Sequence, residues 1–71
     1  MTVVLIRDRK DKDSVEVAFS ESARFYALLR ENRKFDEILR QLHEARENRR
    51  TVHVMMDSPE GSVIQDVRAG D

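Results

Sequence analysis

The chain has 71 residues, with 13 basic and 14 acidic side chains and a formal net charge of −1. This length suits one domain with a small core, and the balanced charge gives no overall attraction to nucleic acid or anionic lipid. The absence of cysteine excludes disulfides and thiolate metal sites. Balanced charges together with runs of valine and isoleucine favour a folded domain over disorder.

No pattern for targeting or membrane insertion is found in the sequence. The apolar run at residues 3–6 is shorter than a signal-peptide core and has no basic segment before it. No stretch approaches the roughly 20 apolar residues that a membrane helix needs. We therefore expect a cytoplasmic protein that does not contact membranes.

The first two elements are predicted to be strands joined by a charged loop. Residues 2–7 are apolar on both faces, which is typical of a strand whose second face is also covered. Residues 8–13 are all charged and form a solvated connection. Residues 14–19 alternate, with Val15 and Phe19 on the same side, and this alternation predicts a half-buried strand.

Helical spacing predicts two helices, or one helix with a sharp break, at about residues 21–31 and 34–49. The two apolar stripes are Phe25-Leu28-Leu29 and Phe35-Ile38-Leu39-Leu42-Ala45. At about 100° per residue the stripes are out of phase, so one straight helix would leave one of them in water. We therefore place a break within Glu31–Lys34, where Asn32 suits a helix end.

A second hairpin is predicted at the end of the chain. Residues 51–56 alternate, Asp57–Gly61 is a turn in which Pro59 restricts φ, and residues 62–68 form the last strand. The predicted fold is an α+β single domain spanning residues 1–71, in the order β-β-α-α-β-β. It has a four-stranded, mainly antiparallel sheet, open or curled like an OB barrel, with the helices on one face.

The last half of the chain carries a resemblance to known domains. The residues concerned are Phe35–Ala45, Val52–Val54, Asp57–Gly61 and Ile64–Val67. This pattern resembles small bacterial domains of unknown function, in which a helix ending in Leu-x-x-Ala precedes a strand, an acidic turn and an Ile-x-x-Val strand. Some of those domains are similar to OB-like barrels. The resemblance implies packing and element order, and it transfers no functional residue.

The sequence shows no catalytic, cofactor or metal constellation. His43 and His53 lack the spacing of a zinc pair, and the acidic turns lack the order of a calcium loop. There is no Gly-x-Ser-x-Gly elbow, and two glycines, Gly61 and Gly70, are too few for a phosphate-binding loop. We therefore expect a protein that is not an enzyme and holds no cofactor or metal.

Apolar residues opposite the predicted helices define the favoured functional hypothesis. The candidate partner surface consists of Val4, Ile6, Met55 and Ile64. Exposed aliphatic and thioether surface of this kind is typical of a protein-binding face. The hypothesis is a small interaction module that self-associates through its sheet as a homodimer. The structural alternative is a curled sheet that covers this face itself.

A nucleic-acid-binding domain is the alternative function. Its candidate surface consists of Arg30, Arg33, Lys34, Arg49 and Arg50. Acidic residues are interleaved with these cations, and an interleaved pattern is more typical of a solvated helix face. Among the aromatic residues, only Tyr26 is predicted to be exposed for base stacking. A sensor of a small ligand is a third alternative, for which no residue pattern names a ligand.

Overall fold

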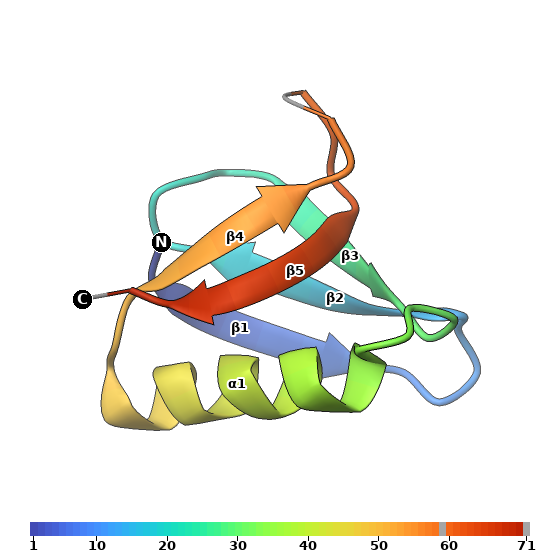
Figure 1. Ribbon diagram of the computed structural model, residues 1–71, viewed down its shortest axis with the longest axis horizontal. Helices are drawn as coiled ribbons and strands as arrows, with labels where there is room; N and C mark the ends of the chain where they lie inside the picture. Colours follow the sequence, from blue (N-terminus) through green and yellow to red (C-terminus); the bar gives the residue numbers. More distant parts are fainter. Residues whose placement is uncertain (59, 71) are drawn as a thin grey trace.

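The computed structural model describes residues 1–58 and 60–70, and within them it contains five strands and one helix (Figure 1). They are β1 (Val3–Asp8), β2 (Ser14–Phe19), β3 (Phe25–Leu29), α1 (Phe35–Asn48), β4 (Val52–Met56) and β5 (Ile64–Ala69). The expectation of one four-stranded sheet with two helices is therefore wrong, although the fold is α+β. Pro59, predicted to restrict the second turn, and the terminal Asp71 lie outside the described residues.

The five strands form two sheets that are joined along both pairs of edge strands. Strands β1, β2 and β3 form an antiparallel sheet, and β4 and β5 form an antiparallel hairpin. Thr2 pairs antiparallel with Thr51, and Ala27 pairs parallel with Val63. The strand neighbours therefore run β1-β2-β3-β5-β4 and back to β1, so that the sheet curls around a common interior (Figure 1).

The segment predicted as the first helix is strand β3. Its five residues are apolar, and a run this short fits a helical stripe as well as a strand. Pairing with β2 decides between them, because Tyr26 lies opposite Val17 and Leu28 lies opposite Val15. Tyr26 and Leu28 consequently face the interior, whereas Phe25 faces outward.

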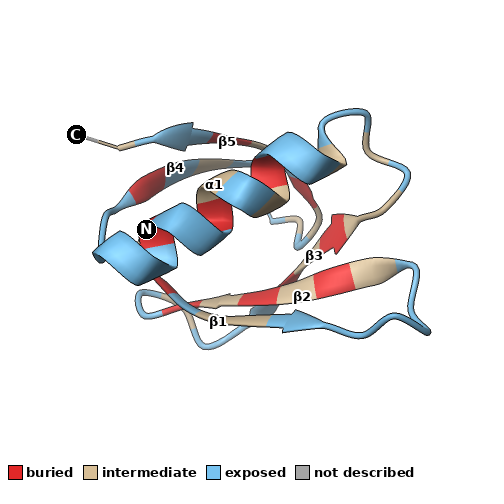
Figure 2. Cartoon of the chain, turned by 90° about the horizontal axis from the view of Figure 1, so that it is seen from below, coloured by how far each residue is buried: buried red, intermediate tan, exposed pale blue. Residues whose placement is uncertain are grey.

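Helix α1 covers the interior between the two sheets. It contacts β1, β3 and β5 and buries Ile38, Leu42 and Ala45 along one face (Figure 2). Asp36 and Glu37 in its first turn suit the helix dipole. The buried apolar core draws on all six elements: Val3, Val15, Val17, Phe19, Tyr26, Leu28, Ile38, Leu42, Ala45, Val52, Ile64 and Val67.

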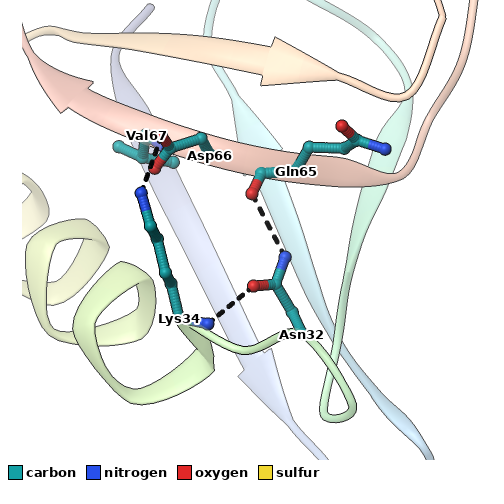
Figure 3. A network of polar contacts seen from close by, with 5 residues as sticks. All are labelled: Asn32, Lys34, Gln65, Asp66 and Val67. Atoms are coloured by element: carbon teal, nitrogen blue, oxygen red, sulfur yellow. Dashed lines mark hydrogen bonds and ion pairs between the residues drawn. The ribbon is translucent and has the colours of Figure 1, made fainter.

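A polar network joins the turn before α1 to strand β5 (Figure 3). The Asn32 side-chain amide donates to the Gln65 carbonyl at 3.1 Å, and its oxygen accepts from the Lys34 backbone N–H at 2.8 Å. The Lys34 ammonium lies 3.4 Å from the Asp66 carboxylate. Within the described residues, β3 is paired to the second sheet by an isolated bridge between Ala27 and Val63, and Asn32 supplies a further link between the two sheets.

Candidate functional site

The predicted partner surface does not form a single patch. Val4 and Met55 are exposed, by 49% and 38%, but Ile6 packs against the core and Ile64 is fully buried. A register shift in the β4–β5 ladder pairs Ile64 with Met56 and turns it inward, so Ile64 belongs to no surface. Val4 and Met55 lie on strands that diverge from the paired Thr2 and Thr51 (Figure 1).

The outer surface of the first sheet exposes an aromatic side chain. Leu5, Ala18 and Phe25 are neighbours in register across β1, β2 and β3, and Phe25 is 49% exposed. The next row contains Arg7, Glu16 and Ala27. We call this surface the Phe25 face, and define it as Val4, Leu5, Arg7, Glu16, Ala18, Phe25 and Ala27.

Two arginines flank the aromatic residues of β3. The Arg7 guanidinium lies 5.6 Å from the centroid of the Phe25 ring. The Arg24 guanidinium lies 5.5 Å from the Tyr26 ring and donates to the Glu60 carbonyl at 3.3 Å. Both distances fall within the range of a cation–π interaction, which at exposed sites contributes about 0.5–1 kcal/mol. Phe25 is therefore held beside a positive charge on an otherwise apolar row.

The two aromatic residues of β3 occupy environments opposite to those predicted from the sequence. Phe25 was expected in the core and is exposed, and Tyr26 was expected at the surface and is 5% exposed. The buried Tyr26 ring packs edge-on against Phe19 at 5.4 Å, and its hydroxyl donates to the Ser22 hydroxyl at 3.0 Å. The five residues of β3 are all apolar, so their sequence does not distinguish the inward side chains from the outward ones.

The predicted nucleic-acid surface is divided into two groups. Arg30, Arg33 and Lys34 precede α1, and Arg49 and Arg50 follow it. The helix has 14 residues and is therefore about 21 Å long. The groups consequently lie at opposite ends of α1, and the fold does not gather them into one basic surface.

Arg30 is engaged within the fold. It forms an ion pair with Asp8 and donates to the carbonyl oxygens of Arg9, at 3.0 Å, and Lys12, at 2.8 Å. Its guanidinium also lies 5.5 Å from the centroid of the Phe35 ring. Arg30 therefore holds the loop between β1 and β2 against the start of α1, which limits its availability to a phosphate.

The described part of the chain contains neither a metal-binding cluster nor a helix that could span a membrane. No group of three or more histidine, cysteine, aspartate or glutamate side chains within residues 1–58 and 60–70 is arranged to hold a metal ion. Helix α1 is neither long nor apolar enough to cross a membrane.

Comparisons with known proteins assign no family. No protein-family model matches the chain, and neither the curated proteins nor the solved structures contain a significant match.

Proposed function

We propose that the protein is a small non-enzymatic protein-interaction module that binds a partner through the Phe25 face. The observation that carries the proposal is the exposed Phe25 ring, in register with Leu5 and Ala18 on the outside of a three-stranded sheet. An exposed aromatic side chain in an apolar row costs solvation free energy unless a partner covers it.

The side chains around Phe25 suit a protein partner. Aromatic residues and arginine are enriched in protein interfaces and dominate their binding energy, and Phe25 and Arg7 lie together on this face. Glu16 lies directly opposite Arg7 on the neighbouring strand, so the face carries both charge signs. A partner with apolar and mixed polar side chains complements such a surface better than a polyanion does.

A nucleic-acid partner is the second candidate, and one observation favours it. Single-strand binders stack bases on exposed aromatics beside cations, and Phe25 with Arg7 offers that pairing. OB-like barrels have five strands and bind oligonucleotides on their second and third strands, and the described residues also form five strands. The candidate residues are then Phe25 and Arg7 rather than the five cations around α1.

Photocrosslinking distinguishes these partners. We expect the photoreactive residue p-benzoylphenylalanine in place of Phe25 to crosslink a protein on irradiation in cells, giving an adduct that nuclease treatment leaves intact. The same residue in place of the exposed His43, on α1, serves as the matched control. An adduct removed by nuclease would favour the nucleic-acid candidate. Equal crosslinking from positions 25 and 43 would contradict both candidates.

A further inference from the structure

Strand β4 has an outer edge that the fold leaves open. Along β4, alternate residues direct their backbone groups to opposite sides. The N–H of Asp57, directly after β4, donates to the Val63 carbonyl on the β5 side, whereas the Val52 N–H donates to the Met1 carbonyl on the other side. Val54 and Met56 have the same orientation as Val52. Their N–H and C=O groups have no backbone partner in residues 1–58 and 60–70.

The length of this open edge is limited at both ends. Met1 occupies the edge at Val52, where it both accepts from the Val52 N–H and donates its amine to the Val52 carbonyl. Beyond Met56 the chain turns back, and Gly61 N–H donates to the Ser58 carbonyl at 3.0 Å. A strand that pairs here has only Val54 and Met56 to bond with, which restricts its register.

We propose that this edge pairs with the same edge of a second copy of the chain, antiparallel, with the two-fold axis at Met55. In this register Val54 of one copy and Met56 of the other exchange both backbone hydrogen bonds, and symmetry doubles the set to four. The two β4–β5 hairpins then form one continuous four-stranded sheet. An open edge without proline or lysine favours such strand addition.

The side chains on the outer face of β4 are self-complementary in this register. Met55 is 38% exposed and meets its own copy on the axis, where two thioethers pack together. His53 lies beside Arg68 on β5 and comes opposite Asp57 of the second copy. His53 and Arg68 of each copy therefore lie near Asp57 of the other copy. This charge complementarity favours a second copy over an unrelated strand.

This inference concerns a different surface from the Phe25 face and is independent of the proposed function. Only two residues per copy contribute backbone bonds, so the dimer is expected to be weak, below the size of a standard stable interface. Met55 was part of the predicted partner surface, and here it acts with His53 and Asp57 rather than with Val4.

Disulfide trapping tests the register, because the chain has no cysteine of its own. The Cα atoms of a directly opposed, non-hydrogen-bonded pair lie about 4.5 Å apart, within the range that a disulfide spans. We expect Met55→Cys to form a covalent dimer under diamide at least about tenfold faster than His53→Cys, whose two copies are about 13 Å apart. Equal rates would overturn the proposal.

A mixture of variants checks the same register at a second position. His53→Cys mixed with Asp57→Cys should give the heterodimer faster than either variant gives its own homodimer, because the antiparallel pairing sets residue 53 opposite residue 57. Homodimers of both variants forming as fast as the heterodimer would indicate random collision and would contradict the proposal.

Sedimentation equilibrium up to millimolar concentration tests the dimer without a covalent bond. We expect Met55→Glu to weaken association by about tenfold or more, because two like charges meet on the axis, whereas Phe25→Ser leaves association unchanged. If Phe25→Ser abolishes association and Met55→Glu does not, the dimer interface is the Phe25 face, and this inference is overturned. A wild-type protein that stays monomeric throughout would overturn it as well.

Discussion

At the scale of single residues, Glu21 ties the loop after β2 to the beginning of the chain. Its two carboxylate oxygens accept from the Thr2 backbone N–H at 2.7 Å and from the Thr2 hydroxyl at 2.9 Å. The backbone N–H of Thr2 is the main cause that lowers the pKa of Glu21 from its ordinary 4.5 to about 2. Because the pKa is lower in the folded state, the ionised carboxylate stabilises the fold.

We predict that Glu21→Gln removes a pH-dependent part of the stability. The contribution of Glu21 is fully present above its ordinary pKa of 4.5 and is lost as the pH falls toward about 2, where the folded carboxylate is protonated. Urea unfolding of both proteins across this range should therefore show a difference in unfolding free energy that shrinks with falling pH. Glu47→Gln, at an exposed position of α1, is the control. A difference that is constant with pH would contradict the prediction.

At the scale of elements, the end of α1 is stabilised by backbone bonds but carries local strain. The N–H groups of Arg49 and Arg50 both donate to the Ala45 carbonyl. This closure requires the left-handed conformation at Arg49, whose φ is 54°. Glycine is the residue that most often occupies this position, because a Cβ atom disfavours a positive φ.

We predict that Arg49→Gly stabilises the fold by about 0.5–1 kcal/mol, because relief of the left-handed strain exceeds the added entropy of the unfolded chain. Arg50→Gly is a matched control, since Arg50 does not have a positive φ, and we expect it to lower stability slightly. The midpoint of thermal unfolding measures both effects. A drop in stability of Arg49→Gly as large as that of Arg50→Gly would contradict this account.

At the scale of the whole molecule, α1 and its buried face connect the two sheets. Leu42 is fully buried in the middle of the helix, and α1 contacts both β1 of the first sheet and β5 of the second. Leu39, expected in the core from its place in the apolar stripe, is half-buried. Leu42 therefore contributes more buried apolar surface to the shared core than Leu39 does.

We predict that Leu42→Ala lowers the free energy of unfolding by about 2–5 kcal/mol, and that Leu39→Ala has a smaller effect. Because one core serves both sheets, amide hydrogen exchange in β2 and β5 should accelerate together in Leu42→Ala. Faster exchange confined to one sheet would mean that the sheets unfold separately and would contradict the prediction.

Local pattern predicted much of this fold. The bounds of β1, β2, β4 and β5 agree with the expected strands to within two residues, and α1 agrees with the second predicted helix. Strands β2 and β4 alternate and α1 carries a stripe from Ile38 to Ala45, whereas β1 and β5 are short apolar runs next to polar connections. Such periods depend on neighbours in the chain, so the sequence alone can express them.

The remaining features depended on contacts between distant segments. Residues 25–29 fit both periods, and only pairing with β2 made them a strand and turned Phe25 outward. The inward position of Ile64 follows from a register shift against β4. The open edge at Val54 follows from the pairing of β4, because β5 bonds only the other edge of this strand and Met1 contacts it at Val52. Composition and local period were set by the sequence itself, whereas strand partners and exposed faces were decided by the tertiary structure, because register changes which face of a strand is buried.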